Sequence, residues 1–427
     1  MGSRAHSDRN NRPPTLAALT GTASFAVLLD IQDELGVSDE KSLVVPTSFD
    51  RPELHFAVIK VRTMDRSNRL LTLMKELPRM LGEESENFFQ LRGTRTNAGI
   101  VFCPHVNGGL GVKAVAAALG THDYYAGSAP KDFQGNWYQH KASVIERFKS
   151  NECAVITASK ALGMGFDKEN VRFTVHYCIP ESVEAFYQEA GRAGRNGQKT
   201  KSVSVVLFAN GDEETPLYFF KNSFPDSAKE SGDVRLLWDE LQKLARVTPE
   251  GEFITVSFHT NETEQGRQEK TIYRLMLLGL IEDYGKDWQR RFFLIKPREF
   301  ERDRVLASLR RIIGRQRFQE DVDHTVGEVA ASSDDKNFVS MAADCLLGFV
   351  YKEIADRRRQ AVHTMAELCR FYKNPEEFRA QILAYLEESE FSVELGKWRG
   401  RSLKEIGLAK ISDLLAKVSS VLGLNER

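Results

Sequence analysis

Two arginines that stand three residues apart are the residues of this sequence best suited to act on phosphate groups. Arg192 and Arg195 lie in the decapeptide QEAGRAGRNG, between Gly191, Gly194 and Gly197. A guanidinium stays charged and binds phosphate oxygens through a fork of N–H groups, and glycine lets a backbone approach a ligand closely. The pattern therefore indicates an arginine finger, which stabilises a phosphoryl group during its transfer. The alternative is a solvated basic turn, because such turns also occur on protein surfaces.

The segments before these arginines alternate between expected strands and helices. The helix-like run SVEAFYQEA (182–190) leads into the arginines, and the apolar runs GIVFC (99–103) and AVIT (154–157) are typical of buried strands. Two runs, 111–120 and 141–150, have helical apolar spacing. Strands that alternate with helices predict a parallel α/β sheet.

A glycine-containing loop follows the second of these strands. The segment TASKALGMGFDK (157–168) carries Gly163 and Gly165 before Asp167. Small residues after a strand allow the backbone to approach phosphates or a sugar. The loop is therefore a second candidate for contact with a nucleotide.

Taken in order, these segments resemble a known family. GIVFC, YYAGSAP (124–130), TASKALGMGFDK and the run from Val171 to Gly197 resemble motifs IV, IVa, V and VI of superfamily 2 helicases, and within them RecQ-type DNA helicases. LTGTAS (19–24) resembles motif III, and SFDRPEL (48–54) resembles the segment that leads into the second RecA-like lobe. The resemblance covers about residues 15–210 and implies an ATP-dependent motor that acts on DNA.

The resemblance also implies roles for the residues near the nucleotide. Arg195 would be the arginine finger that reaches ATP held on the other lobe, and Arg192 would be its partner at the phosphates. Gln188 would order the nucleotide or the attacking water. Asp167 would meet the ribose side of the nucleotide, with Gly163 and Gly165 shaping the loop.

Four hydroxyl residues receive roles on the same basis. Thr157 and Ser159 would touch the DNA backbone, and Thr22 and Ser24 would couple hydrolysis to lobe movement. The alternative for Thr157 and Ser159 is that strand-end hydroxyls cap the next helix.

The sequence departs from the family pattern in the parts that bind ATP. A phosphate-binding loop would read GxxxxGK followed by Ser or Thr, whereas the Gly-Lys pairs here, at 285–286 and 396–397, are followed by Asp287 and Trp398. No apolar strand ends in a DExH-type pair. We therefore expect that the first RecA-like lobe is largely absent, that ATP and Mg²⁺ are bound mainly by that missing lobe, supplied in cis or in trans, and that this chain alone is inactive.

Two smaller departures concern DNA contact. Tyr125 stands where RecQ-like proteins usually carry a histidine, and Pro104–Asn107 does not match the usual Ser-Arg element.

Cysteine use and hydropathy limit the cofactors and the compartment. The five cysteines show no CxxC spacing, and Cys103, Cys153 and Cys178 lie in apolar runs, so we expect core residues and no zinc. The leader 1–14 has no apolar core of a signal peptide and is expected to be disordered. No run approaches the length of a membrane span. These features predict a cytoplasmic protein without a membrane partner.

A basic stretch follows the expected motor lobe. With a net charge of −1 over 427 residues, any DNA-binding surface must be local. Residues 286–317 carry eleven Lys or Arg against four acids. We expect a helix over 267–284, a turn at 285–287 and a strand over 288–296, a pattern that resembles a winged helix. Trp288, Arg290 and Arg291 would then contact a duplex junction. The alternative is a structural module with Trp288 packed on the hairpin.

The sequence thus predicts an α/β fold with several parts. These are a disordered leader (1–14), a remnant of the first RecA-like lobe (15–48), the second RecA-like helicase lobe (49–210), a linker (211–232), a winged-helix-like module (233–298) and an all-helical C-terminal region (299–427).

The expected function is the C-terminal portion of an ATP-dependent RecQ-like DNA helicase that couples hydrolysis to translocation on single-stranded DNA and unwinding at a duplex junction. Two alternatives stay open. One is a non-catalytic DNA-binding or partner protein that retains the second lobe. The other is a superfamily 2 translocase that remodels protein–nucleic acid complexes without unwinding.

Overall fold

The computed structural model describes most of the chain between residues 50 and 386. It describes residues 50–386 except 164–165, 196–200, 224–225, 245–252, 315–316 and 318, and in addition residues 17, 31, 32 and 35. These residues form two compact units. Unit 1 comprises residues 17, 50–210 and 368–386, and unit 2 comprises residues 31, 32, 35 and 211–367. Among these residues no helix is both long and apolar enough to cross a membrane.

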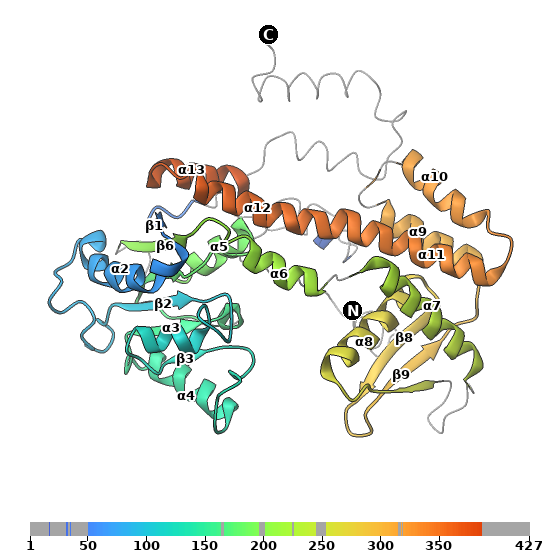
Figure 1. Ribbon diagram of the computed structural model, residues 1–427, viewed down its shortest axis with the longest axis horizontal. Coiled ribbons are helices and arrows are strands. Elements are labelled where there is room, and N and C mark those ends of the chain that lie inside the picture. Colours follow the sequence, from blue (N-terminus) through green and yellow to red (C-terminus); the bar gives the residue numbers. More distant parts are fainter. Residues whose placement is uncertain are drawn as a thin grey trace, which may run out of the picture. The chain divides into compact units, whose positions relative to one another are not determined.

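A six-stranded parallel sheet forms the centre of unit 1 (Figure 1). The strands lie in the order β1-β6-β5-β2-β4-β3, and every pairing is parallel. Their bounds are β1 (Leu54–Lys60), β2 (Ala98–Phe102), β3 (Tyr124–Tyr125), β4 (Val155–Ala158), β5 (Val171–His176) and β6 (Ser202–Phe208). Strands β2, β5 and β6 are buried along their whole length, because helices cover both faces of a sheet built from strand–helix–strand units. The predicted α/β fold with a RecA-like parallel sheet is confirmed.

Helices connect these strands, and those that follow β2, β3 and β5 lie about where the apolar spacing predicts them. They are α2 (Arg66–Leu81), α3 (Val112–Ala118), α4 (Trp137–Lys149) and α5 (Val183–Ala190), with short 3-10 turns η2 (Thr63–Asp65) and η3 (Lys160–Gly163). Helix α2 ends at Gly82, which has a φ of +74°, and α5 begins after Ser182, whose hydroxyl accepts a hydrogen bond from the Ala185 amide at 3.1 Å. Glycine after a helix and serine before one are the residues that suit these positions.

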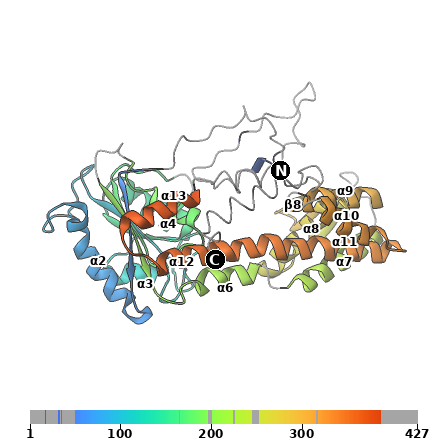
Figure 2. The same ribbon diagram turned by 90° about the horizontal axis from the view of Figure 1, so that it is seen from above.

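One helix from the far end of the described chain also belongs to unit 1. Helix α13 (Pro375–Leu386) packs on β1 and α5, and the red end of the ribbon lies over these elements in Figures 1 and 2. Phe378, which is 1% exposed, meets the ring of Phe186 edge-on at 5.8 Å between centroids. The lobe is therefore assembled from two stretches of sequence that lie far apart.

Unit 2 begins with a small α/β module. Its elements are α6 (Glu214–Ser223), α7 (Ser227–Lys243), β7 (Ile254–Ser257), α8 (Glu262–Leu277), β8 (Ile281–Asp287) and β9 (Phe292–Pro297). The three strands form an antiparallel sheet in the order β7-β9-β8. A helix followed by a two-stranded hairpin, with a third strand at its side, is the winged-helix-like arrangement that the sequence predicts.

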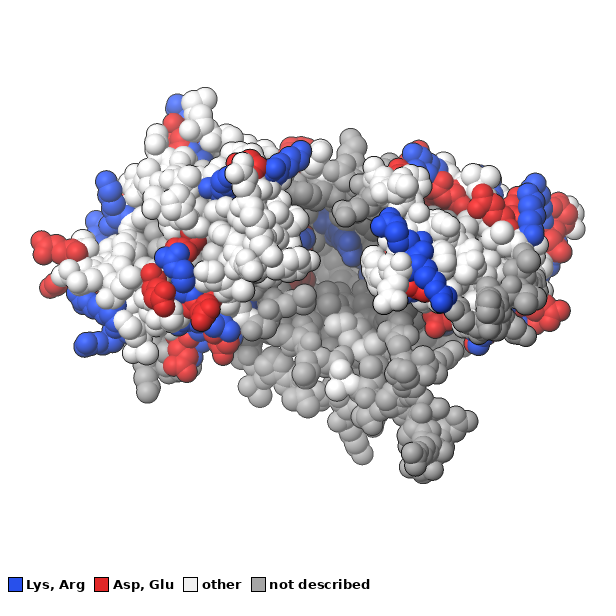
Figure 3. Space-filling view, turned by 90° about the horizontal axis from the view of Figure 1, so that it is seen from below, with Lys and Arg blue, Asp and Glu red and all other residues white. Residues whose placement is uncertain are grey.

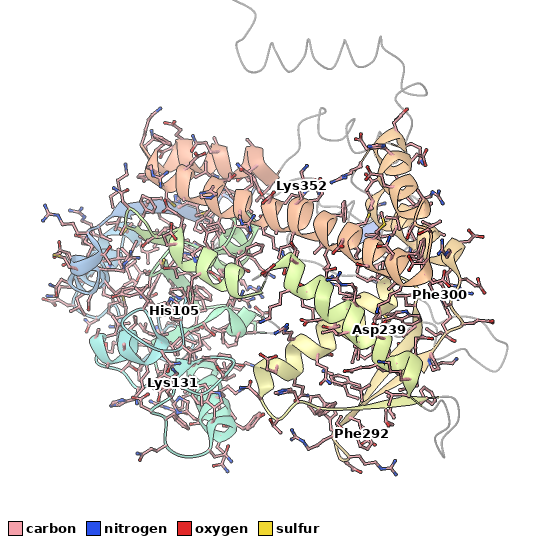
Figure 4. The ribbon with its side chains drawn as sticks, turned by 45° about the vertical axis from the view of Figure 1, so that its right-hand side comes forward. His105, Lys131, Asp239, Phe292, Phe300 and Lys352 are labelled. Atoms are coloured by element: carbon pink, nitrogen blue, oxygen red, sulfur yellow. The ribbon has the colours of Figure 1, made fainter. Side chains whose placement is uncertain are left out.

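The predicted boundaries inside this module are wrong. Residues 281–287 form strand β8 instead of the end of the expected helix and its turn, because the chain leaves α8 at Gly279, which has a φ of +76°. The turn of the hairpin consequently lies at 288–291, which the sequence assigned to a strand. Figure 4 marks Phe292 at that end of the hairpin.

The rest of unit 2 is helical, as predicted. Its elements are α9 (Arg302–Ile313), α10 (Gln319–Ala330), α11 (Asp335–Phe349), a π-helical segment η4 (Val350–Ala355) and α12 (Asp356–Arg370). One hydrophobic core runs from α7 through the hairpin to α11. A buried ion cluster joins these parts, because Glu230 of α7 accepts hydrogen bonds from Lys270 (2.7 Å), Arg274 (2.8 Å) and the Tyr351 hydroxyl (2.9 Å).

Candidate functional site

The two arginines lie on a short turn directly after α5. Within this turn, which we call the arginine turn (Gly191–Arg195), the amide of Gly191 donates to Tyr187 at 2.8 Å and that of Ala193 to Ala190 at 3.0 Å. The Gly194 amide donates to the carbonyl of Val171, the first residue of β5, at 3.1 Å. Gly194 has a φ of +71°, a conformation that glycine adopts without strain. The turn is therefore fixed at the edge of the sheet where the strands begin.

The side chains of the two arginines differ in their surroundings. Arg192 is 5% exposed and donates from Nη1 to the carbonyl of Phe166 at 3.0 Å. Burial, and then the positive charge of Arg195, lower the pKa of Arg192. Arg195 is exposed; it donates from Nη1 to the Asp167 carboxylate at 2.7 Å and from Nε to the Gly191 carbonyl at 3.3 Å. Of the two guanidiniums, that of Arg195 is the one open to a ligand.

Asp167 and Gln188 complete this group. Asp167 is exposed and forms an ion pair with Arg195. The resemblance implied that Asp167 meets the ribose side of a nucleotide and that Arg195 reaches its phosphates, and in the structure the two side chains contact each other. Gln188 is exposed near the end of α5, one helical turn before Arg192. The structure thus brings Arg192, Arg195 and Asp167 together beside the same edge of the sheet.

Thr157 and Ser159 lie at the other edge, where the strands end, and their hydroxyls bond within the lobe. Thr157 is 0% exposed and donates from Oγ1 to the Val112 carbonyl at 2.8 Å. Ser159 is 8% exposed, and its Oγ accepts from the Ala161 amide at 3.4 Å. The Ser159 contact is compatible with the alternative of local capping, whereas Thr157 donates to a helix carbonyl. In this conformation the Thr157 hydroxyl is not accessible to DNA.

The other residues expected in the nucleotide and coupling sites are described only in part. Gly163 ends η3 after β4. Gly165, Thr22 and Ser24 lie outside the described residues.

The hairpin of unit 2 presents an aromatic residue and two arginines at its turn. Trp288 is 67% exposed; its ring meets Phe258 edge-on at 5.5 Å, and Lys286 Nζ lies 5.0 Å from the ring centroid. Arg290 and Arg291 are exposed, and Arg291 has a φ of +61°. Because Trp288 contacts Phe258 of the module and most of its side chain is exposed, both expected roles, packing and base stacking, are compatible with its position.

Charges on the surface are mixed in sign. On the face that Figure 3 shows, lysines and arginines are interspersed with acidic residues, in keeping with the net charge of −1. Any basic surface for nucleic acid on this face is therefore local.

The cysteines expected in the core are buried there. Cys103, Cys153 and Cys178 are 3%, 7% and 3% exposed. Burial raises the pKa of Cys153 to about 12, so that its thiol stays protonated at neutral pH. Within the described part of the chain, no group of three or more His, Cys, Asp or Glu side chains is placed to hold a metal ion.

Sequence reasoning did not single out Arg51, which contacts the arginine turn directly. Its guanidinium donates to the carbonyls of Gly191 (3.0 Å), Ala193 (3.3 Å) and Gly194 (3.0 Å). The residue stands in SFDRPEL, a segment noted for its resemblance, but nothing in one sequence indicates that it reaches a turn 140 positions away.

Comparisons with known proteins agree with this geometry. Residues 86–197, which include β2 to α5 and the arginine turn, match the family model described as helicase conserved C-terminal domain. Unit 1 therefore contains the conserved C-terminal domain of a helicase.

The curated proteins to which this chain is similar include several that are named as ATP-dependent DNA helicases. ATP-dependent DNA helicase Q1 of Pongo abelii is 31% identical over 202 residues, 46% of this chain and 27% of that protein. The probable ATP-dependent DNA helicase RecS of Bacillus subtilis (strain 168) is 31% identical over 208 residues, 47% and 35% of the two chains. ATP-dependent DNA helicase RecQ of the same organism is 34% identical over 205 residues, 47% and 29% of the two chains. The match thus spans about a third or less of the length of these relatives.

A solved structure of S. cerevisiae Dbp5 bound to RNA and ADP BeF3 aligns over 48% of each chain with a TM-score of 0.32 and 15% identity, which is too weak to add to the assignment. The family match, the sequence identity and the parallel sheet agree with one another. The matched part of this chain is similar to the C-terminal RecA-like lobe of RecQ-type superfamily 2 helicases.

Proposed function

We propose that this chain is part of an ATP-dependent RecQ-like DNA helicase, in which unit 1 stabilises the phosphoryl group during transfer. Arg195 is the arginine finger, and Arg192 supports the charge at the phosphates. The nucleotide and Mg²⁺ are bound mainly by a first RecA-like lobe, supplied in cis or in trans. Hydrolysis there drives translocation along single-stranded DNA and unwinding at a duplex junction.

The position of Arg195 is the observation that carries this proposal. Its guanidinium is exposed, whereas the backbone that bears it is held by hydrogen bonds to α5 and β5. Preorganised charge of this kind stabilises a transition state because little reorganisation is needed during the reaction.

The contact with Asp167 is compatible with such a role. Asp167 is 72% exposed in the pair, and exposed ion pairs contribute only about 0–1 kcal/mol. Phosphate oxygens can therefore replace the carboxylate at low cost. ATP supplies the phosphoryl group, and Mg²⁺ neutralises the charge on its phosphates; the protein's own contribution at this surface is the fixed guanidinium.

The hairpin of unit 2 supports the DNA part of the proposal. Trp288 is available for stacking on a base at a fork, and Arg290 and Arg291 are available for phosphate contacts. We propose these three residues, rather than the buried Thr157, as the DNA contacts to test first. The expected site of action is the cytoplasm.

DNA-stimulated ATP hydrolysis tests the proposal directly. The full chain alone is expected to be inactive, and addition of a RecQ-type first lobe should produce activity. Arg195→Ala should lower kcat by about 10³-fold or more, as loss of an arginine finger does elsewhere. Arg92→Ala is the matched control, because Arg92 lies in the same lobe and its guanidinium bonds to the nearby Gln90 side chain.

Full activity of the Arg195→Ala protein would remove the arginine-finger assignment. ATP hydrolysis by the chain without a first lobe would contradict the proposal that the nucleotide is bound mainly by that lobe. Strand separation on a forked duplex would distinguish unwinding from remodelling of a bound protein.

A further inference from the structure

Arg51 binds the backbone carbonyls of the arginine turn. Its Nη1 donates to Gly191 O at 3.0 Å, and its Nη2 lies 3.0 Å from Gly194 O and 3.3 Å from Ala193 O. One guanidinium thus serves three carbonyls of a five-residue turn. Glu53 orients it, because Glu53 Oε1 accepts from Arg51 Nε at 2.7 Å and the Glu53 side chain is 8% exposed.

These carbonyls need a partner that the helix does not provide. The last carbonyls of a helix have no amide in the following turn to bond with, and the amides of Gly191, Ala193 and Gly194 already donate inward to α5 and β5. A cationic side chain near a helix C-terminus satisfies such carbonyls and suits the negative end of the helix dipole. Arg51 therefore completes the hydrogen bonding of the turn.

The carbonyl of Gly191 links Arg51 to Arg195. It accepts from Arg51 Nη1 at 3.0 Å and from Arg195 Nε at 3.3 Å. A shift of this carbonyl would move the base of the Arg195 side chain. The position of the Arg195 side chain consequently depends on Arg51, which holds the Gly191 carbonyl in place.

Helix α13 holds the segment of Arg51 in place. Arg379 pairs with the Asp50 carboxylate, which neighbours Arg51 in sequence, and donates from Nη1 to the Leu54 carbonyl at 2.5 Å. The same helix contacts α5, since the Tyr385 hydroxyl lies 3.1 Å from Glu184 Oε1. Both the segment that carries Arg51 and the helix that precedes the arginine turn are thus fixed to α13.

We propose that Arg51 is a positioning residue for the arginine turn: it fixes the carbonyls of Gly191, Ala193 and Gly194 so that Arg195 projects in one direction. The contacts of α13 hold Arg51 at the distance that this requires. The consequence for catalysis rests on the proposed function, whereas the effect on the turn does not.

Hydrogen exchange in the full chain tests the effect on the turn. Arg51→Gln should speed exchange of the Gly191, Ala193 and Gly194 amides by about tenfold or more, because local opening becomes more frequent when carbonyls lose their hydrogen-bond partners. Exchange in β2 and β5 should stay as in the parent protein. Arg51→Lys, which keeps the charge and one donor group, should give an intermediate rate, and Arg92→Gln should have no effect. Unchanged exchange in the turn of the Arg51→Gln protein would overturn the proposal.

Hydrolysis in the presence of the first lobe tests whether Arg51 acts through Arg195. Arg51→Gln should lower kcat by about 10²-fold, the size expected when a catalytic group is displaced by about 1 Å, with little change in the KM for ATP. In the Arg195→Ala background, the same substitution should have almost no further effect, since residues that act as a unit are not additive.

Additive losses in the double variant would show that Arg51 does not act through Arg195 and would overturn the proposal. If the parent protein hydrolyses no ATP even with a first lobe, the proposed function fails, and the exchange rates of the turn still decide whether Arg51 positions it.

Discussion

Replacement of Gly194 by alanine tests how closely the arginine turn fits the segment that precedes β1. Gly194 combines a left-handed backbone, with a φ of +71°, and a close approach to other residues. A Cβ at this position would lie 3.0 Å from Glu53 Cγ and 3.2 Å from Leu54 Cδ2. The substitution therefore introduces both backbone strain and a steric contact.

Gly82 offers a control that separates the two effects. It has a φ of +74° at the end of α2, and a Cβ there would meet nothing within 4 Å. Gly82→Ala should lower the free energy of unfolding of unit 1 by about 1–2 kcal/mol, the cost of left-handed backbone for a residue with a Cβ. Gly194→Ala should cost this amount and roughly 1–2 kcal/mol more, because crowding a well-packed site is also destabilising.

Native-state hydrogen exchange is the suitable assay. The slowest amides of β5 and β6, both buried along their whole length, exchange through global opening of the lobe and so report its free energy of unfolding independently of unit 2. In the ATPase assay with a first lobe, Gly194→Ala should also lower kcat, whereas Gly82→Ala should not. Equal destabilisation by the two substitutions would refute the close fit between the arginine turn and the Glu53–Leu54 segment.

Three further predictions concern charged residues. Glu230→Gln should destabilise unit 2 by about 3 kcal/mol because it leaves the buried Arg274 and the half-buried Lys270 without their carboxylate. Urea denaturation would measure this loss. Burial alone would raise the pKa of Glu230, but the hydrogen bonds and charges of its two cationic partners outweigh burial and lower this pKa. The stabilisation by Glu230 should therefore be complete above the pKa of the unfolded state and be lost as the pH falls through the pKa of the folded state. A pH profile of the unfolding free energy without this loss would contradict the assignment. Arg290→Ala with Arg291→Ala should weaken duplex binding and reduce the slope of log K against log salt by about 1 for each phosphate that the arginines no longer neutralise, and an unchanged slope would leave the hairpin structural. Asp167→Asn should change the stability of unit 1 by less than about 0.5 kcal/mol, since the ion pair with Arg195 is exposed, and should raise the KM for ATP. A loss of kcat alone would indicate that Asp167 orients Arg195 and does not contact the ribose.

The fold of unit 1 could be predicted from the sequence because its signals are local. The apolar strands over 99–103 and 154–157 and the helices over 111–120 and 182–190 follow from spacing and from the residues that cap them. The arginine turn was recognisable because Arg192 and Arg195 stand among glycines. Each of these signals lies within about a dozen residues of chain, which is the range over which periodicity and capping act.

Features that depend on distant contacts could not be predicted. The C-terminal region is expected to be helical, but its sequence does not tell which surface the helix over 375–386 covers, and the contacts of Arg379 with Asp50 join residues 329 positions apart. The same holds for Arg51. The error at 281–287 has another cause: the run RLMLLGLIEDY has helical apolar spacing on both sides of Gly279, and the left-handed backbone at that glycine decides where the helix ends.

The return of α13 to unit 1 has a consequence for synthesis on the ribosome. Sheet and arginine turn are complete at residue 210, but the helix that covers β1 and α5 is finished only at residue 386. At 5–20 residues per second, about ten to thirty-five seconds separate these two points. During this interval Phe56 and Phe186, which are 2% and 0% exposed in the complete lobe, lack the cover of Phe378 and Arg379. The nascent chain would thus expose an apolar face that a chaperone can bind, and unit 1 would be among the last parts of the described chain to reach its final packing.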